Sequence, residues 1–251
     1  MIAIVLAGGY AKRLWPLTLN KPKALLPLAG RSMIDYIVGK LATLDPSMQR
    51  IILSTNMKFL NQFQKWLKAG QYRGVELFPE NSRSEAEKTG AVRALADVIE
   101  KTGEHDVLVV AGDNLFTDDL NEFLRFFREK HASTVALYRA RDLDEARRGS
   151  EVTVGEGGMI LEFEEKPCRP KTTLVGGCIY AFQAGIGKRL REYLELHVST
   201  DEPGRFIEWL CKQEPVYGYL LQHYLWDIGT VEAYKRASEY YAQNTRVFAQ
   251  A

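Results

Sequence analysis

The sequence predicts an α/β protein in which helices cover both faces of a mostly parallel, mixed central sheet, a three-layer sandwich. Two observations predict this class. Short aliphatic runs alternate with helix-spaced segments through the first part of the chain, and such alternation builds parallel crossover units. Beyond about residue 150 the strand-like runs follow one another more closely around a glycine-rich turn. The second part of the sheet is therefore expected to be mixed.

The first part of the chain is expected to contain strands separated by helices. Each strand is a short run of β-branched or aliphatic residues, and each helix has apolar residues at a spacing of three to four positions. The expected strands span residues 2–6, 51–54, 75–78, 107–111 and 134–138. The expected helices span residues 33–44, 58–67, 85–99 and 120–130.

The second part of the chain is expected to be richer in strands. Strand-like runs cover residues 152–154, 159–164, 175–182 and 216–226, and residues 155–158 are typical of a hairpin turn. A last helix is expected over residues 231–241, after Gly229 and Thr230. No Pro/Ser-rich linker, internal repeat or low-complexity tract divides the chain, so residues 1–251 are expected to form one domain.

The composition argues against nucleic-acid binding and against a membrane protein. Lys and Arg number 33 against 32 Asp and Glu, so no field of one sign would attract a nucleic acid. Cys168, Cys178 and Cys211 lack disulfide or zinc spacing and are expected to be free thiols. Neither a signal sequence nor a stretch of about 20 apolar residues is present. We therefore expect a soluble, cytoplasmic protein with no membrane partner.

Residues 6–23 form the most informative segment, because they follow the first strand and combine glycines with cations. Gly8 and Gly9 lack a Cβ atom, so their N–H groups could approach an anion and the turn could take a positive φ. Arg13 and Lys23 add positive charge. Ligands of such sheets bind at the carboxyl ends of strands, so the segment predicts a polyphosphate site. The two glycines alone are equally typical of an ordinary strand-to-helix turn.

Two aspartates follow apolar runs far apart in the sequence. Asp113 follows the expected strand 107–111 and Gly112, where a carboxylate would point into a ligand crevice and suit Mg²⁺ bound to phosphates. Taken alone, Asp113 is also typical of a turn or helix N-cap. Asp227 follows a second apolar run beside Trp226. Two such carboxylates could hold one cation between them.

Residues 162–167 combine acidic residues with Lys166 and Pro167. Lys166 could bind a phosphate as a point charge, and Glu165 could accept hydrogen bonds from hydroxyl groups. The alternative is a solvated strand edge. The four histidines are scattered without a nucleophile or ligand spacing, and the sequence contains neither a P-loop motif nor a Gly-x-Gly-x-x-Gly motif. These absences argue against a P-loop kinase and a dehydrogenase.

Taken together, these segments resemble the signature of the sugar-1-phosphate nucleotidylyltransferases, the nucleotide-sugar pyrophosphorylases, and among them the glucose-1-phosphate thymidylyl- and uridylyltransferases. In that family Leu-Ala-Gly-Gly leads to Arg-Leu-x-Pro-Leu-Thr and then Lys-Pro-Lys, as in residues 6–23. Residues 225–230 resemble its second metal-binding signature, and residues 165–167 its sugar-phosphate motif. One departure is that Tyr10-Ala11-Lys12 stands where the family usually has x-Gly-Thr.

The resemblance implies roles for the matching residues. Catalysis is implied for Arg13, Lys23 and Asp113. Nucleotide binding is implied for Leu6, Ala7, Gly8, Gly9, Arg13, Lys23, Gly90 and Asp113. Sugar-phosphate binding is implied for Asn114, Gly149, Glu165, Lys166 and Val175, and Mg²⁺ binding for Asp113 and Asp227.

The resemblance also implies a fold and a reaction. The fold would be a Rossmann-like core with a nucleotide-binding part over about residues 1–140, a sugar-binding part over about 141–230 and a C-terminal helix over about 231–245, without the C-terminal β-helix domain of some members. The reaction would be Mg²⁺-dependent nucleotidyl transfer from a nucleoside triphosphate to a sugar 1-phosphate, with UTP or dTTP and glucose 1-phosphate as the expected substrates. A homo-oligomer is compatible with this family.

Three alternatives stay open. The first is GTP with mannose 1-phosphate, and the second is CTP-dependent transfer to a non-sugar phosphate, against which Glu165 speaks because a choline pocket favours aromatic residues. The third is a non-catalytic regulatory subunit, which would be expected to lose the charged residues that this chain retains. The base is poorly determined, because the family's frequent Gln upstream of Gly90 has no clear counterpart and residues 81–88 are longer and more charged than usual.

Overall fold

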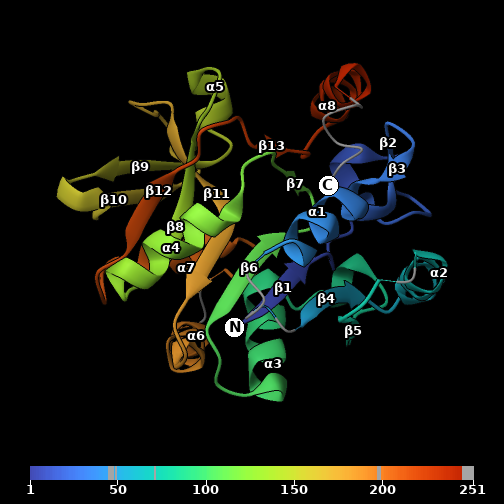
Figure 1. Ribbon diagram of the computed structural model, residues 1–251, viewed down its shortest axis with the longest axis horizontal. Helices are drawn as coiled ribbons and strands as arrows, with labels where there is room; N and C mark the ends of the chain where they lie inside the picture. The colour runs from blue at the N-terminus through green and yellow to red at the C-terminus, as the bar shows by residue number, and fades with distance from the viewer. Residues whose placement is uncertain (45–47, 49, 71, 197–198, 245–251) are drawn as a thin grey trace.

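The computed structural model describes residues 1–44, 48, 50–70, 72–196 and 199–244, and shows a central sheet between two layers of helices (Figure 1). The sheet has nine strands. In chain order they are β1 (Ile2–Leu6), β4 (Ile51–Asn56), β5 (Val75–Glu80), β6 (Val107–Ala111), β8 (Thr134–Arg139), β9 (Ser150–Val154), β10 (Ile160–Glu165), β11 (Leu174–Phe182) and β12 (Tyr217–Leu220).

Helices cover both faces of the sheet. Because successive residues of a strand point to opposite sides, each strand contributes apolar side chains to both faces. In β1, Ala3 and Val5 belong to one hydrophobic core, whereas Ile2 and Ile4 belong to the other. The first core contains residues of α1 (Met33–Ala42), α2 (Leu60–Gly70), α4 (Leu120–Lys130) and α8 (Val231–Gln243). The second contains residues of α3 (Ala91–Thr102), α6 (Ile186–Glu195) and α7 (Pro203–Leu210). The predicted three-layer sandwich is confirmed.

Strand directions confirm a mostly parallel, mixed sheet. The order β5-β4-β1-β6 is parallel throughout. β11 runs antiparallel to β6, β8 and β9, so these three share one direction, and β12 is parallel to β8. Only β11 and β10, which is antiparallel to β9, run the other way among the nine strands.

The opening in the sheet is created by β11. Its pairing with β8 runs along most of one edge. The opposite edge is divided, because residues 179–182 pair with β6 whereas Val175 and Gly176 pair with β9. β6 and β9 therefore separate beside Gly177 and Cys178. This separation places a cleft next to the carboxyl ends of β6 and β1.

Some expected elements differ from the structure. The helix expected over residues 85–99 is a short 3₁₀ turn, η3 (Glu85–Glu87), followed by α3, because Gly90 takes a φ of +89° between them. The strand expected over 216–226 is divided into β12 and β13 (Trp226–Asp227). Helices α6 and α7 were not predicted, although Pro203 at the first turn of α7 is a known start signal. The predicted hairpin turn over 155–158 joins β9 and β10, as expected.

The remaining short elements complete the molecule. They are η1 (Lys12–Leu14), η2 (Lys23–Leu25), β2 (Pro27–Leu28), β3 (Arg31–Ser32), β7 (Asn114–Leu115), α5 (Leu143–Ala146) and η4 (Glu156–Gly158). Among the described residues, no helix combines the length and the apolar character that a membrane span requires.

Helix α8 anchors the chain just beyond Asp227. The side chain of Thr230 accepts a hydrogen bond from the Ala233 N–H at 3.1 Å and so caps the helix. Tyr241 is buried and contacts Tyr36 of α1 edge-on, with ring centroids 4.9 Å apart. The capped helix therefore holds the segment that follows Asp227 against the first hydrophobic core.

Replacing Thr230 by Ala is expected to lower the free energy of unfolding by about 1 kcal/mol, because the first-turn N–H group of Ala233 loses its acceptor. Thr230→Ser retains the hydroxyl and should lose much less. Urea unfolding of the three proteins checks this prediction. Equal stabilities for the Ala and Ser variants would contradict the capping role.

Candidate active site

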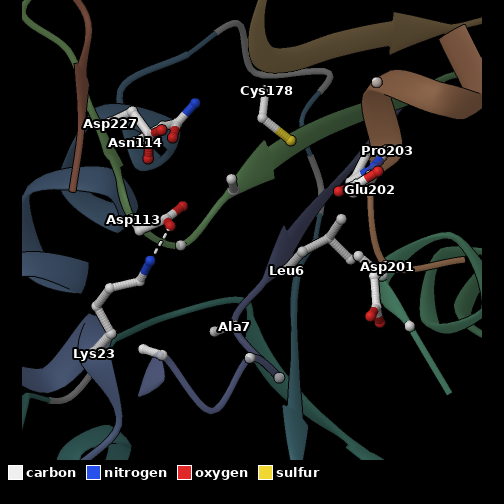
Figure 2. Close-up of a pocket in the computed structure, with 18 of the residues that line it drawn as sticks. Leu6, Ala7, Lys23, Asp113, Asn114, Cys178, Asp201, Glu202, Pro203 and Asp227 are labelled. Carbon is white, nitrogen blue, oxygen red and sulfur yellow. Dashed lines mark hydrogen bonds and ion pairs between the residues drawn. The ribbon is translucent and has the colours of Figure 1, made fainter. Parts of the chain in front are cut away.

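A single cleft at the separation of β6 and β9 brings the predicted residues together (Figure 2). Its cavity volume is about 490 Å³. Of the predicted residues, those that line it are Leu6, Ala7, Gly8, Gly9, Arg13, Lys23, Gly90, Asp113, Asn114, Gly149, Glu165, Lys166 and Asp227. Val175 is the exception: its side chain is fully buried in the first core. The structure thus places Val175 behind the cleft wall and not on it.

The loop after β1 is held by the neighbouring strand β4. The Ala7 N–H donates to the carbonyl of Ser54 at 2.8 Å, and Asn56 Nδ2 donates to the carbonyl of Gly8 at 2.8 Å. Within the described residues, the N–H groups of Gly8 and Gly9 have no protein acceptor. They remain available to a ligand at the carboxyl end of β1.

The turn does take a positive φ, but at Ala11, with a φ of +48°, and not at Gly8 or Gly9. The absence of a Cβ atom provides space at Gly8 instead. A Cβ at Gly8 would lie 2.1 Å from Glu80 Oε1, whereas a Cβ at Gly9 would meet no atom within 4 Å. A side chain at Gly8 would thus displace the Glu80 carboxylate, and no protein atom fills the space above Gly9.

Two cations follow this loop. Arg13 lies in η1 and is exposed, while Lys23 begins η2 and is only partly exposed. Lys23 Nζ forms an ion pair with Asp113, as Figure 2 shows. The hydroxyl of Thr18 donates to the carbonyl of Ala11 at 2.8 Å and holds the loop between the two cations. Lys23 thus lies at the end of β6, and Arg13 lines the same cleft and helps to lower the pKa of Asp227.

The two acids come together through a short ladder. β13 pairs antiparallel with β7, so that Asp227 lies opposite Asn114, the residue next to Asp113. The Ile228 N–H donates to the carbonyl of Asp113 at 3.1 Å. Asp113 and Asp227, distant in sequence, are neighbours on the wall of the cleft (Figure 2).

The acid pair lacks full compensation by cations. Although Asp227 is exposed at the open cleft, desolvation by the protein around it raises the pKa of Asp227 to about 6, and repulsion from Asp113 adds to the shift, while Lys23 and Arg13 oppose it. Among the described residues, no group of three or more His, Cys, Asp or Glu side chains forms a metal cage. Mg²⁺ is usually held by one or two carboxylates together with substrate phosphates. The pair therefore fits Mg²⁺ that binds along with a phosphate ligand.

The opposite side of the cleft carries the other predicted motif. Glu165 pairs with Ser150 across β10 and β9, and the next residue, Lys166, donates its N–H to the carbonyl of Gly149 at 2.8 Å. The Glu165 carboxylate accepts a hydrogen bond from the Ser150 hydroxyl. Lys166 forms an ion pair with Glu202, which precedes α7. The backbone pairing thus places Gly149, Glu165 and Lys166 side by side.

Several lining residues were missed by the sequence reasoning. Lys88 forms ion pairs with Asp201 at 2.7 Å and with Glu85 at 3.0 Å on the wall near Gly90. A Cβ at Gly204 would lie 1.9 Å from Glu165 Oε2, so this glycine makes room for the carboxylate. The Pro at the start of α7 could have indicated that a helix end approaches the cleft. No sequence signal indicated the contacts themselves.

Replacing Asp227 by Asn is expected to raise the melting temperature of the metal-free protein at pH 7.5, and to raise it less at pH 5. A carboxyl group whose folded pKa lies above its usual value of 3.8 opposes folding when ionised, and this cost fades as the pH falls below about 6. Thermal unfolding in EDTA at both pH values checks this prediction. Asp144→Asn, at an exposed site outside the cleft, is the matched control. An equal shift at both pH values would contradict the prediction.

Comparison with known proteins extends the resemblance of the motifs to the whole chain. The family model described as nucleotidyl transferase matches residues 2–244. The bifunctional protein GlmU of Methanocaldococcus jannaschii is 29% identical over 235 residues, 91% of this chain and 51% of the relative. A glucose-1-phosphate adenylyltransferase of Desulfitobacterium hafniense is 28% identical over 261 residues, 98% of this chain and 65% of the relative. The chain thus spans about half to two thirds of the length of these relatives.

Solved structures share the fold. A Bacillus anthracis protein assigned as a glucose-1-phosphate thymidylyltransferase, in complex with sucrose, has a TM-score of 0.82 at 24% identity and covers 96% of both chains. A UDP-glucose pyrophosphorylase complexed with UDP-glucose has a TM-score of 0.78 at 18% identity, covering 97% of this chain and 98% of the other. Because the family model spans nearly the whole chain, the protein belongs to the nucleotidyl transferase family.

Proposed function

We propose that the protein transfers a nucleotidyl group from a nucleoside triphosphate to a sugar 1-phosphate and releases pyrophosphate. One observation carries the proposal: five charged side chains from separate segments line a single cleft. They are Arg13, Lys23, Asp113, Lys166 and Asp227. The cavity of about 490 Å³ is in the size range of small-molecule sites.

The chemistry requires little besides charge and position. An oxygen of the sugar phosphate attacks the α-phosphorus, and the bond from the α-phosphorus to the bridging oxygen breaks, with the electron pair leaving on pyrophosphate. The attacking oxygen is already an anion, so no general base is needed. The obstacle is repulsion between two anions and charge that develops on the phosphates. Fixed positive groups and alignment overcome it, as in phosphoryl transfer generally.

The cations of the cleft supply this charge. Lys23 is paired with Asp113 in the ligand-free structure, and we infer that it turns to the α-phosphate when the nucleotide binds. Arg13, exposed on η1, would stabilise the leaving pyrophosphate. Mg²⁺ held by Asp113 and Asp227 would supply further positive charge to the phosphate oxygens.

The other end of the cleft suits the sugar phosphate. Lys166 is ion-paired with Glu202, so a sugar phosphate would take the place of that carboxylate. Glu165 would accept hydrogen bonds from sugar hydroxyls beside Gly149. A Cβ at Gly149 would meet protein atoms no closer than 3.8 Å, so packing of the protein itself does not require a glycine there. The bare backbone leaves room for the sugar ring.

A substrate matrix tests the proposal. ATP, CTP, GTP, UTP and dTTP are each combined with the 1-phosphates of glucose, mannose, galactose and N-acetylglucosamine, and with phosphocholine and an alditol phosphate, and pyrophosphate release is measured. UTP or dTTP with glucose 1-phosphate is the pair that the motif resemblance implies. Release with a sugar 1-phosphate supports the proposal. Release only with the non-sugar phosphates, or with none, would overturn it.

Asp113→Asn is expected to lower turnover by about 10²-fold or more, the usual effect of deleting one preorganised electrostatic contact in a transition state. Steady-state rates at saturating Mg²⁺ check this prediction. Asp144→Asn, an exposed change outside the cleft, is the control. Near-wild-type turnover would remove Asp113 from the metal site.

Arg13→Ala is expected to lower kcat more than it raises the KM for the nucleotide, because the charge it meets is greatest in the transition state. Arg125→Ala removes an exposed arginine of α4 outside the cleft and serves as the control. Initial rates over a range of nucleotide concentrations separate the two constants. An effect confined to KM would contradict the role given to Arg13.

A further inference from the structure

Glu80 is a partly buried carboxylate in the cleft that the proposed chemistry does not use. It is the last residue of β5, and its Oε1 accepts a hydrogen bond from the Ser54 hydroxyl at 2.7 Å. Among the described residues, no Lys, Arg or His forms an ion pair with it. Burial raises the pKa of the carboxyl, and Asp97 adds repulsion. Glu80 therefore offers the cleft a hydrogen-bond acceptor without an ionic partner.

The close approach of Glu80 to the first loop shows that this acceptor is part of the cleft wall. A Cβ at Gly8 would lie 2.1 Å from Oε1 and 2.3 Å from Oε2, so both carboxylate oxygens lie against the glycine. Oε2 has no hydrogen bond within the described part of the chain. An acceptor partly withdrawn from water gains from a donor on a ligand, because leaving it unpaired is costly.

The order of the strands places Glu80 at one end of the cleft. Glu165 and Lys166 lie at the end of β10, Asp113 follows β6, the glycine loop follows β1, and Glu80 ends β5 beyond β4. If the sugar phosphate lies at β10 and the α-phosphate near Asp113, as the proposed function holds, the nucleoside extends past Gly8 toward β5. A Cβ at Gly9 would meet no protein atom within 4 Å, so this glycine does not block that path. The base edge then meets Glu80.

We propose that Glu80 recognises the base and selects guanine, an inference that rests on the proposed function. An ionised carboxylate only accepts hydrogen bonds. Guanine presents two donors side by side, N1–H and the N2 amino group, which match the two oxygens. Adenine and cytosine place an acceptor nitrogen next to their amino group, and uracil and thymine place one N–H between two carbonyls. In each of these four bases, an acceptor atom would face a carboxylate oxygen, which is itself an acceptor. This proposal replaces UTP and dTTP as the expected nucleotides.

The isosteric change Glu80→Gln tests the proposal. The amide keeps an oxygen for the Ser54 hydroxyl but turns one acceptor into a donor, which opposes the guanine donors and suits the N3–H and carbonyl of uracil or thymine. In the wild type, kcat/KM for GTP should exceed that for UTP and dTTP by about 10- to 100-fold. In Glu80→Gln, the value for GTP should fall by about 10- to 100-fold, with no such fall for UTP or dTTP.

Glu76→Gln is the matched control, because Glu76 lies on the same strand, is exposed and pairs with Arg50 at 2.7 Å outside the cleft. It should leave the ranking of nucleotides unchanged. A wild-type preference for UTP, dTTP, ATP or CTP would overturn the proposal. An equal loss with every nucleotide in Glu80→Gln would also overturn it, since that is the effect of a purely structural carboxylate.

Binding measured by calorimetry separates this inference from the proposed function. Wild-type protein that binds GTP more tightly than UTP, and loses this preference in Glu80→Gln, supports guanine recognition even if no pyrophosphate is released. Pyrophosphate release with a nucleotide other than GTP as the preferred substrate supports nucleotidyl transfer and overturns the role of Glu80. The melting temperature of Glu80→Gln, compared with that of Glu76→Gln, verifies that the variant is folded.

Discussion

The divided edge of β11 is the constraint on which the rest of the structure depends. A strand has two edges, and β8 occupies one of them, so β6 and β9 must share the other. Their separation beside Gly177 and Cys178 opens the sheet. The glycine loop after β1 and Asp113 after β6 then face Glu165 and Lys166, at the end of β10, across one cleft. The pairing of the backbone thus decides that two distant motifs serve the same site.

Under the proposed function, the ion pairs within the cleft occupy positions that phosphate groups of the substrates would take. Lys23 is paired with Asp113, Lys166 with Glu202 and Lys88 with Asp201. Each pair balances the charge of a lysine in the ligand-free cleft; Lys23 is partly buried, whereas Lys88 and Lys166 are exposed. In the proposed function a bound phosphate would replace the carboxylate on a lysine, and a divalent cation would balance the charge of Asp113, which is freed from Lys23, and of Asp227. The protein has a net charge of only +1, so its attraction for anions is local to the cleft.

The strands, and the charged residues that the structure brings to the cleft, could be picked out from the sequence because their signals are local. An aliphatic run followed by Gly-Gly or by Asp113 marks a strand end from sequence alone. The start of α3 could not be predicted, because it depends on the positive φ of Gly90. Gly90 lies against Thr200, and a Cβ at Gly90 would lie 2.4 Å from the Thr200 carbonyl oxygen. Glu80 was missed for the same reason. The role proposed for Glu80 depends on its contacts with Gly8 and Ser54, and only the assembled sheet brings these residues together.

The most direct test of nucleotidyl transfer follows the phosphorus atoms. The protein is incubated with a sugar 1-phosphate and with nucleoside triphosphate labelled either at the α- or at the γ-phosphorus, and the products are separated. The α-label should appear in a nucleotide sugar and the γ-label in pyrophosphate, in equal amounts. Appearance of the γ-label as orthophosphate, or an α-label that stays in free nucleotide, would show that this cleft does not join the two substrates.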